Sequence, residues 1–554
     1  MSLEIANLIF PKVDRKISDL ERIFPERNLK EGSIVTRFAP SPTGFLHTGS
    51  LFTSLVSWRF AKQTDGVFFC RLEDTDQKRE IEGSGDKVLE QLYKFNVIPD
   101  ESFLKEGNYG PYIQSKRKGI YHVVIKEMLE KGLAYPCFCT HEELNEIRKE
   151  QEEKKLLPGY YHEFAKCRFL SDDEVIERLK NNQEYVIRFK SQGKNDDYVV
   201  LEDAIRGDIR FPKNIQDVVI MKSDGLPTYH FAHVVDDHFM RTTHVTRGEE
   251  WIPSAPIHLE IFEQLQWQKP VFCHFPVIMK VDDGKRRKLS KRKDEEASVD
   301  YFLEKGYPIE GFLEYLMTLA NSNFEEWRLE NPQANIFDFK LDFKKMSLDG
   351  ALFDLEKVSS ISKDRLAFMT KEQFTKRAVD YAKNYDDELF DLINRDIEYF
   401  KRIINIEREQ EKPRKDYEKY SDILPIISFM YDRYFSGLIK VLPFNHRFSI
   451  DLIMEILTKY SDIMNLDLDQ EQWFGQMRDL AVDFGFAKKP KDYKSNPDVF
   501  LGHVGEFAEI LRIATCGKAS TPNFYDVLKI LGKDRVIDRI NYTLELLKEK
   551  RSQL

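Results

Sequence analysis

Two stretches of the chain combine residue types that can hold a triphosphate, and the first is Arg37-Phe-Ala-Pro-Ser-Pro-Thr-Gly-Phe-Leu-His47-Thr-Gly49-Ser50. A short apolar strand ends here, a stiff Pro/Gly loop follows, and a helix is expected to begin at or near His47. A helix N-terminus presents N–H groups and a partial positive charge, which stabilise a phosphate. His47 would be a donor to that phosphate, and Gly49 would let a base or ribose approach the backbone. The alternative is a capped turn with a surface histidine, which is the commoner meaning of a lone His-x-Gly.

The second stretch is Lys285-Arg-Arg-Lys288-Leu-Ser290-Lys291-Arg292-Lys293, in which seven of nine residues are basic. A basic run of this kind usually forms a solvated loop or a nucleic-acid patch. Here, however, Leu289 and Ser290 interrupt the run, and acidic residues flank it on both sides. A mobile loop that closes lysines onto a triphosphate would have this composition, with Ser290 able to bond a phosphate or the backbone.

The elements that would position these stretches alternate between strands and helices. From Ser33 onward, a short strand, the Pro/Gly loop and a helix with apolar residues at helical spacing lead to a second strand over residues 67–74. Such βαβ units build parallel sheets, and the pattern returns over residues 217–237. Residues from about 134 to 215 indicate an insertion, and beyond about Glu310 the chain becomes helical and charged. Residues 1–31 are expected to pack on the domain that follows them.

The bulk properties exclude several classes of protein. A length of 554 residues predicts several domains, and a formal net charge of −10 argues against binding nucleic acid by bulk charge, although local basic patches stay allowed. The chain contains no run of about 18 apolar residues, so no membrane association is expected. The N-terminal residues lack the pattern of a secretion signal, which favours a cytoplasmic protein. The six cysteines do not form a disulfide framework.

Together the two stretches resemble the paired nucleotide-binding motifs of class I aminoacyl-tRNA synthetases. The motif known as HIGH stands here as His47-Thr48-Gly49-Ser50, and the motif known as KMSKS stands as Lys288-Leu289-Ser290-Lys291-Arg292. Their order and their separation of about 240 residues fit two halves of a Rossmann-like domain split by an insertion. Thr48 and Ser50 depart from the family's isoleucine and histidine. The first histidine and the glycine, which make the contact in the family, are both present.

Further stretches narrow the resemblance to the glutamyl and glutaminyl enzymes. They are Arg71-Leu-Glu73-Asp74-Thr-Asp76, Gly225-Leu-Pro-Thr228-Tyr229-His-Phe-Ala-His233 and His244-Val-Thr-Arg247-Gly248-Glu249-Glu250-Trp251. Ala351-Leu-Phe353-Asp354 and Leu531-Gly532-Lys533 resemble the stem-contact region and the end of the helical anticodon domain of bacterial-type glutamyl enzymes. His233 departs from the family, which often has asparagine at this position. The resemblance is collinear from about Val35 to the C-terminus.

The resemblance implies an α/β fold, a class I Rossmann-like catalytic domain with an inserted α+β domain, followed by all-α C-terminal domains. The implied parts are an N-terminal extension (1–31), the first catalytic half (32–133), an inserted connective, acceptor-binding domain (134–216), the second catalytic half (217–300), a stem-contact domain (301–380) and a helical anticodon-binding domain (381–554). The implied partners are tRNA(Glu), glutamate and ATP with Mg2+, and the implied state is a monomer.

The resemblance also implies a reaction. In the family, the α-carboxylate of glutamate attacks the α-phosphorus of ATP, and the terminal ribose of the tRNA then accepts the glutamyl group. The implied catalytic residues are His47, Lys288 and Lys291. The implied ATP-binding residues are His47, Gly49, Ser50, Lys288, Leu289, Ser290, Lys291 and Arg292. The implied glutamate-binding residues are Arg37, Ala39, Ser41, Glu73, Tyr229, His233 and Arg247.

Within that implied set, Glu73 would accept the α-ammonium of glutamate, and Arg37 and Arg247 would meet its two carboxylates, for which the guanidinium fork is well suited. Taken alone, each arginine would more commonly form a surface ion pair.

Three cysteines, Cys137, Cys139 and Cys167, cluster in the predicted insertion. With one histidine or tyrosine from the segment 160–162 they would hold a tetrahedral structural zinc ion. Some glutamyl enzymes have such a site, and Arg168, which stands where a fourth ligand is sometimes found, cannot serve as one. The alternative is three reduced cysteines without a metal.

Three other functions share part of this pattern. Glutaminyl-tRNA synthetases have the same core motifs but end in β-barrels, whereas the C-terminal half of this chain predicts helices. A short tRNA-modifying paralogue lacks the anticodon portion, which a chain of 554 residues has room for. A catalytically inactive tRNA-binding regulator would not need His47, Glu73 and Lys291 together.

Overall fold

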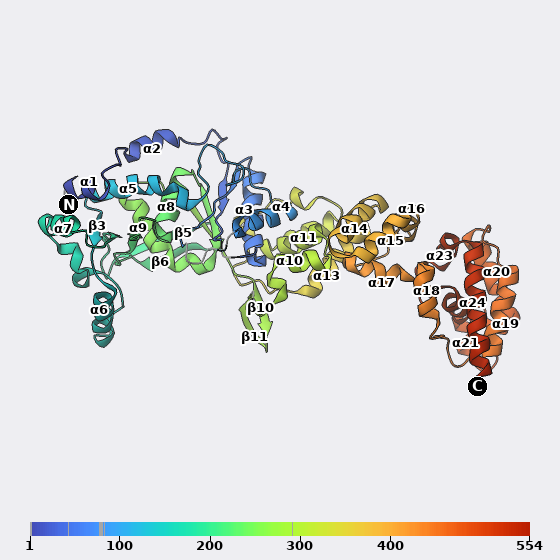
Figure 1. Ribbon diagram of the computed structural model, residues 1–554. Coiled ribbons are helices and arrows are strands. Elements are labelled where there is room, and N and C mark those ends of the chain that lie inside the picture. The colour runs from blue at the N-terminus through green and yellow to red at the C-terminus, as the bar shows by residue number, and fades with distance from the viewer. Residues whose placement is uncertain (1–2, 43, 77–80, 82, 291, 554) are drawn as a thin grey trace. The chain divides into compact units, whose positions relative to one another are not determined.

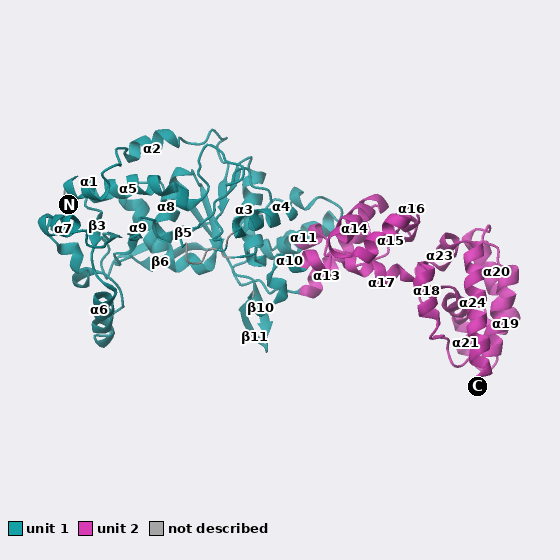
Figure 2. Ribbon diagram, in the orientation of Figure 1, with its two compact units in different colours: residues 1–301, 313–354 teal, residues 302–312, 355–554 magenta. Residues whose placement is uncertain are grey.

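A computed structural model describes residues 3–42, 44–76, 81, 83–290 and 292–553 of the protein. The chain forms two compact units, shown in Figure 2. Unit 1 comprises Met1–Tyr301 and Leu313–Asp354, and unit 2 comprises Phe302–Phe312 and Leu355–Leu554. The finer division into six parts drawn from the sequence stays a prediction.

The strands of unit 1 are short and come from distant parts of the chain (Figure 1). They are β1 (Val35–Phe38), β2 (Val67–Cys70), β3 (Ala134–Cys137), β4 (Val186–Phe189), β5 (Tyr198–Asp203), β6 (Gly207–Pro212), β7 (Val219–Met221), β8 (His244–Gly248), β9 (Val271–Phe275), β10 (Met279–Asp282) and β11 (Lys285–Lys288). Its helices are α1 (Leu3–Ile9), α2 (Ile17–Ile23), α3 (Thr48–Gln63), α4 (Ser84–Lys94), α5 (Lys118–Glu130), α6 (His141–Glu153), α7 (Asp172–Lys180), α8 (Tyr229–Phe239), α9 (Ala255–Gln264) and α12 (Phe324–Glu330). Helices α10 (Val299–Lys305) and α11 (Ile309–Ala320) lie where the chain passes between the units.

The predicted βαβ unit is formed by β1, α3 and β2, and the two strands are parallel with Val35 opposite Val67 and Phe38 opposite Cys70. The second strand is shorter than expected, because it ends at Cys70 and not at residue 74. Beyond Cys70, the N–H groups of Leu72 and Glu73 donate to loop carbonyls and not to a neighbouring strand. This turn out of the sheet lets the charged side chains of the following segment point into buried ion pairs.

The strands of the predicted insertion share sheets with the second catalytic half. β3 and β4 form a three-stranded sheet with β7, and the hairpin β5–β6 continues into β9 and β8 in the order β6-β5-β9-β8. β5 and β8 both run parallel to β9, so their carboxyl ends meet at one edge. Asp203 of β5, Arg247 of β8 and His274 of β9 lie at or next to that edge.

The N-terminal extension packs on unit 1, as expected. Ala6 and Phe10, in or just after α1, and Leu20 and Phe24, in or just after α2, belong to the hydrophobic core that includes α5 and α8. Arg27 then donates two hydrogen bonds to Glu101, at 2.8 and 2.9 Å. Burial of these apolar side chains fixes the extension to the domain.

Unit 2 is helical, in agreement with the sequence. Its helices are α13 (Leu355–Phe368), α14 (Lys371–Tyr385), α15 (Asp387–Arg395), α16 (Ile397–Ile404), α17 (Ile423–Ile427), α18 (Asp432–Ile439), α19 (Ile450–Ile463), α20 (Gln470–Asp483), α21 (Pro490–Ser495), α22 (Val504–Cys516), α23 (Phe524–Leu531) and α24 (Lys533–Ser552). Two short strands, β12 (Phe486–Ala487) and β13 (Gly502–His503), pair in parallel. Side-chain N-caps such as Thr370, Ser449 and Asp469 begin these helices where the sequence changes from loop to apolar periodicity.

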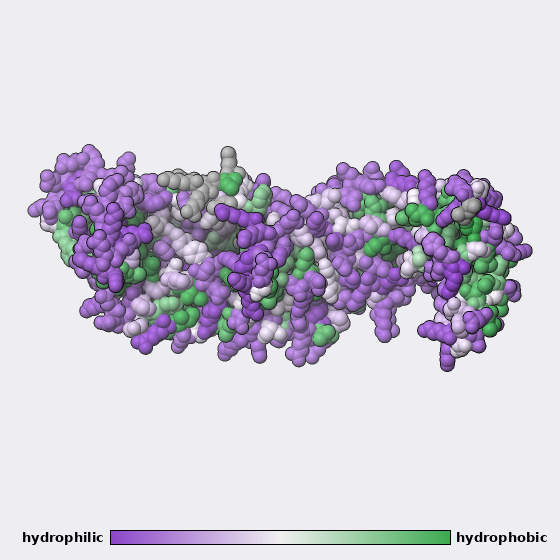
Figure 3. Space-filling view, turned by 90° about the horizontal axis from the view of Figure 1, so that it is seen from below, coloured by the Kyte–Doolittle hydropathy of each residue, from purple (hydrophilic) through white to green (hydrophobic). Residues whose placement is uncertain are grey.

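The face of the molecule in Figure 3 is mostly hydrophilic, and its apolar residues lie in small, separated patches. In the described part of the chain, no helix is both long enough and apolar enough to cross a membrane.

Candidate active site

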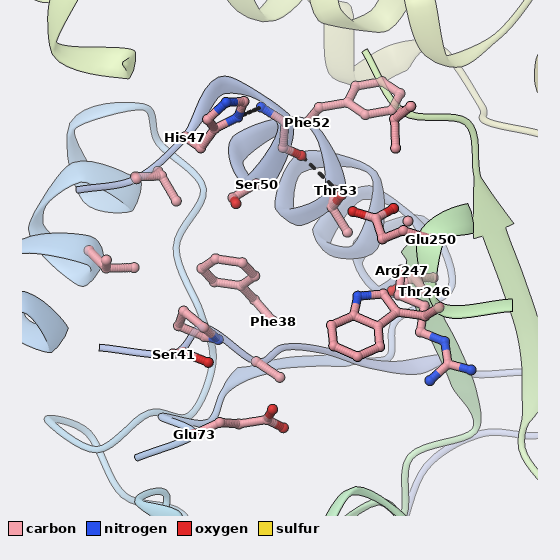
Figure 4. Close-up of a pocket in the computed structure, with 18 of the residues that line it drawn as sticks. Phe38, Ser41, His47, Ser50, Phe52, Thr53, Glu73, Thr246, Arg247 and Glu250 are labelled. Carbon is pink, nitrogen blue, oxygen red and sulfur yellow. Dashed lines mark hydrogen bonds between the residues drawn. The ribbon is translucent and has the colours of Figure 1, made fainter. Parts of the chain in front are cut away.

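A pocket of about 460 Å³ lies in unit 1, where the carboxyl ends of β1 and β8 meet the N-terminus of α3 (Figure 4). In that view, His47 and Glu73 lie on opposite sides of Phe38, and Arg247 lies beside Thr246. The predicted site residues that line the pocket are Arg37, Ala39, Ser41, His47, Gly49, Ser50, Glu73, Tyr229, Arg247 and Lys288. The sequence therefore brought together part of the pocket wall from segments about 240 residues apart.

Other predicted residues lie elsewhere. His233, Leu289, Ser290 and Arg292 are described but do not line the pocket. Lys291 falls outside the described residues. For the residues that line the pocket and for those that do not, the nucleotide-binding and glutamate-binding roles assigned from the resemblance stay predictions.

His47 is the N-cap of α3, so the helix begins where the sequence predicted. The ring Nδ1 of His47 accepts a hydrogen bond from the N–H of Gly49 at 2.9 Å. Because Nδ1 accepts, the proton of a neutral ring lies on Nε2, which makes Nε2 a donor. The side chain therefore both caps the helix and offers a donor suited to a phosphate at the same N-terminus.

Gly49 has a packing role that the sequence did not reveal. A Cβ built at this position would lie 3.2 Å from Nδ1 of His47, closer than side chains normally approach. A larger residue would push the imidazole away from its capping hydrogen bond. The glycine therefore keeps His47 in place, in addition to any close approach of a nucleotide.

Arg37 is buried and already paired. Its Nε lies 3.1 and 3.2 Å from the two carboxylate oxygens of Asp237, and its Nη1 donates to the carbonyl of Thr246 at 3.3 Å. Burial raises the pKa of Asp237, but Arg37, His233 and Arg71 outweigh it and hold that pKa well below its usual range. Arg37 thus lines the pocket as a cation whose charge is largely compensated.

Glu73 forms an ion pair with a fully buried arginine, Arg71. Arg71 donates to Glu73 Oε1 at 3.0 Å and to Asp237 Oδ1 at 3.0 Å. Gln114 also approaches Glu73 Oε1, at 3.4 Å. Burial raises the pKa of Glu73, and the charge of Arg71 opposes that shift. The carboxyl group therefore lies fixed on the pocket wall, where it can meet a cationic group.

Arg247 differs from Arg37 because the side chains that contact its guanidinium are neutral histidines. Nε donates to Nε2 of His274 at 2.9 Å, and Nη1 lies 3.4 Å from ring nitrogens of His233 and His258. Nη2 is buried and has no hydrogen-bond partner among the described residues. A buried cation without a paired carboxylate is unfavourable until an anion binds beside it.

The histidines around Arg247 are neutral. Burial lowers the pKa of His233 to about 3, although Asp237 opposes the shift, and burial also lowers the pKa of His258 well below its usual range. His233 stacks on Tyr229 with ring planes 7° apart and lies behind the pocket wall. It therefore supports Tyr229 and Arg247 and does not itself face the pocket.

The first four residues of the basic stretch form the second strand of a β-hairpin, so the expectation of a loop over residues 285–288 was wrong. β10 and β11 pair antiparallel, and Asp283 and Gly284 form the turn with φ of 48° and 75°. An Asp-Gly pair is a strong signal for such a two-residue turn, but the density of charge concealed it in the sequence.

One basic side chain of this hairpin, Arg287, forms a structural ion pair, whereas another, Lys288, lines the pocket. Arg287 donates two hydrogen bonds to the buried Asp294, at 2.6 and 2.7 Å, and Ser290 donates its N–H to the same carboxylate. Lys288 instead bonds Glu250 at 2.7 Å and lines the pocket. Ser290 therefore fastens the end of the hairpin, whereas Lys288 is available at the pocket rim.

Several pocket residues were not predicted. Phe38, Thr246, Glu250 and Trp251 line the wall, and Trp251 packs on Tyr229 with ring centroids 4.5 Å apart. Thr246, Glu250 and Trp251 belong to the stretch from His244 to Trp251 that resembles the glutamyl and glutaminyl enzymes, and that resemblance was the signal that could have found them. A platform of two aromatic rings suits a flat or apolar part of a ligand.

The three predicted cysteines are close together. Their sulfur atoms lie within 4.8 Å of one another, and Sγ of Cys139 is 3.6 Å from Sγ of Cys167. Tyr160 Oη lies 3.2 Å from Cys139 Sγ and 3.5 Å from Cys137 Sγ. Hydrogen bonds from Cys139 and then Cys167 lower the pKa of Cys137, which favours a thiolate. Arg168 instead pairs with Asp217 at 2.9 Å.

Comparisons with known proteins agree with this geometry. Residues 33–349 match the family model described as "tRNA synthetases class I (E and Q), catalytic domain", and residues 502–544 match an "Anticodon binding domain". A protein of Clostridium perfringens (strain 13 / Type A) named "Glutamate--tRNA ligase" is 45% identical over 98% of this chain and 100% of its own length. One of Acetivibrio thermocellus with the same name is 44% identical over 98% of this chain and 99% of its own.

The chain belongs to the glutamate–tRNA ligases. It is thus a class I aminoacyl-tRNA synthetase, which uses ATP, an amino acid and tRNA. A crystal structure described as a glutamate tRNA ligase from Elizabethkingia meningosepticum CCUG26117 in complex with its amino acid has a TM-score of 0.73 and 28% identity, and covers 93% of this chain and 99% of that one. The α/β catalytic fold with a helical C-terminal region, expected from the sequence, is confirmed.

Proposed function

We propose that the pocket of unit 1 binds glutamate and ATP side by side and forms glutamyl-adenylate. The α-carboxylate oxygen bonds to the α-phosphorus as the bond to pyrophosphate breaks, and pyrophosphate leaves with the electron pair. A ribose hydroxyl at the 3′ end of tRNA(Glu) then attacks the carbonyl carbon, and AMP leaves. The protein contributes positioning and charge stabilisation to both steps.

Arg247 is the observation that supports the glutamate subsite most strongly. It is a pocket-lining cation, about 5% exposed, whose buried Nη2 has no hydrogen-bond partner in the described part of the chain, and neutral histidines lie around it. A substrate carboxylate would supply the missing negative charge. Glu73, on the same pocket, would accept the α-ammonium, and Ala39, Ser41 and Tyr229 would complete the wall.

The nucleotide subsite would lie at the N-terminus of α3. His47 would donate from Nε2 to a phosphate, and the N–H groups of the first helical turn would add to it. Lys288 would exchange its bond to Glu250 for a phosphate, because a triphosphate with Mg2+ offers a stronger field than one exposed carboxylate. Lys291 and Arg292 would act from the segment that follows.

The test of the proposed function is to charge purified tRNA(Glu) and tRNA(Gln) side by side with glutamate and with glutamine. Glutamate should be attached to tRNA(Glu), with release of AMP and pyrophosphate. Attachment of glutamine would contradict the assignment of the pocket. Charging of tRNA(Gln) with glutamate would be consistent with the assignment of the pocket to glutamate and would show only that the enzyme accepts a second tRNA.

We also propose that the enzyme acts as a monomer in the cytoplasm. The six cysteines are free, which suits a reducing compartment. Sedimentation at several protein concentrations would contradict the monomer if it revealed a stable dimer.

We propose further that Cys137, Cys139 and Cys167 bind a structural zinc ion, with Tyr160 beside the fourth position. Zinc–sulfur bonds of about 2.3 Å in a tetrahedron place two sulfur atoms about 3.8 Å apart. The 3.6 Å between Cys139 and Cys167 fits that requirement. Zinc would join the segments around residues 138 and 167 and would take no part in the reaction.

The zinc proposal predicts one zinc ion per chain in protein purified without added metal. Cys139→Ser should remove it and lower the thermal unfolding midpoint, because a structural ion contributes to folding. Cys516→Ala, in the core of unit 2, is the matched control and should keep the metal. Metal analysis that finds no zinc in the unaltered protein, with full charging activity, would contradict the proposal.

A further inference from the structure

Three neighbouring strands place Asp203, His274 and Arg247 in a row that leads from behind the pocket to its wall. Arg247 lies directly opposite His274 in the register of β8 and β9, and Asp203, the last residue of β5, lies opposite Phe272 of β9. All three residues are at the edge where the carboxyl ends of these strands meet. Asp203 and His274 are buried and do not line the pocket.

A continuous set of hydrogen bonds joins the three side chains. Nδ1 of His274 lies 2.7 Å from Oδ2 of Asp203, and Nε2 of His274 accepts from Nε of Arg247 at 2.9 Å. The carboxylate of Asp203 is itself fixed, because it also accepts the N–H groups of His274, Ile205 and Arg206 at 2.9 to 3.1 Å. Each atom in the row therefore has a defined partner.

The direction of these bonds fixes the tautomer of His274. A carboxylate only accepts, so Nδ1 must carry the proton, and Nε2 of the neutral ring is left as an acceptor. Burial lowers the pKa of His274, which keeps the ring neutral despite the nearby carboxylate. Asp203 thus compensates part of the charge of Arg247 through an imidazole, without occupying the guanidinium.

We propose that Asp203 and His274 are positioning residues for the recognition of glutamate. They hold Nε of Arg247, and the histidines His233 and His258 contact Nη1, so that Nη2 stays available for a substrate carboxylate. A direct Asp–Arg pair, such as the one between Asp237 and Arg37, would fill the guanidinium and weaken the attraction for the substrate. This inference rests on the proposed role of Arg247 in the glutamate subsite.

The decisive variants change the acceptor while keeping the ring or the side-chain reach. His274→Phe preserves the ring shape and removes both nitrogens, whereas His274→Gln returns an oxygen acceptor. We expect His274→Phe to raise the KM for glutamate by about 10-fold or more, with kcat and the KM for ATP changed by less than about twofold. His274→Gln should recover a substantial part of that loss.

Asp203→Asn tests the tautomer. Its amide N–H would face Nδ1 and drive the proton to Nε2, where it would oppose the N–H of Arg247 Nε. The glutamate KM of Asp203→Asn should rise about as much as that of His274→Phe, and the double variant should be no worse than either single one.

Two controls separate the proposal from its alternatives. His244→Phe, on the same strand as Arg247 but at the opposite end, should leave the glutamate KM unchanged. Unfolding midpoints identify any loss of stability. The proposal is overturned if His274→Phe raises the KM values for ATP and glutamate equally, or if His274→Gln is no better than His274→Phe. If Arg247→Gln itself leaves the glutamate KM unchanged, the proposed glutamate subsite fails first.

Discussion

Replacing Arg247 by glutamine should raise the KM for glutamate about 30-fold or more, with a much smaller effect on the KM for ATP. The substrate carboxylate would enter a buried region and lose water without gaining its cation, which costs roughly 2–5 kcal/mol. The three described histidines that contact Arg247 are neutral, so none of them replaces its charge. Steady-state charging at varied glutamate and saturating ATP measures the effect.

Arg22→Gln is a suitable control, because that side chain is 78% exposed on α2. It should change neither KM. Arg37→Gln should behave differently from Arg247→Gln, since Arg37 also neutralises Asp237. We expect a higher glutamate KM together with a lower unfolding midpoint. If both the Arg37 and the Arg247 variants had the wild-type KM for glutamate, glutamate would have to bind at another site, and the assignment of glutamate as the substrate would be weakened.

Replacing His47 by asparagine should lower the rate of glutamate activation about 100-fold or more. Asparagine is among the best N-cap residues, so it would keep the bond to Gly49 that begins α3. It would remove the ring Nε2, the donor proposed to meet charge that develops on the phosphates. Glutamate-dependent exchange of pyrophosphate into ATP, measured in the presence of tRNA, reports this step.

His47→Ala is the matched comparison, because it removes both the donor and the cap. It should lose activation to a similar extent and should also be less stable by about 1 kcal/mol, the usual contribution of an N-cap. If His47→Asn activates glutamate at the normal rate while His47→Ala is merely less stable, the histidine is a structural cap. The ATP would then have to be held by other groups of the pocket.

Local patterns explain why much of the site could be predicted. The Pro/Gly loop and the helix start at His47 depend on residues close in sequence, and so does the βαβ unit around them. The three cysteines were also found by their types and spacing, and their sulfur atoms do come together. The hairpin of β10 and β11 was missed although its Asp-Gly turn was visible, because charge was weighed above turn geometry.

The sequence by itself determined the family, the catalytic fold, the helical C-terminal half and the polar and charged residues His47, Glu73 and Arg247 that line the pocket. Only the tertiary structure decided which arginine of the pocket is paired with a carboxylate and which is not. Arg37 and Arg247 look equivalent in the sequence, yet Asp237, 200 residues from Arg37, neutralises one, while His274 and His233 leave the other open to an anion. The pairing of buried charges depends on which strands become neighbours and in what register. No local pattern encodes that information, because the energy of a buried ion is set by groups that only folding brings within a few ångströms.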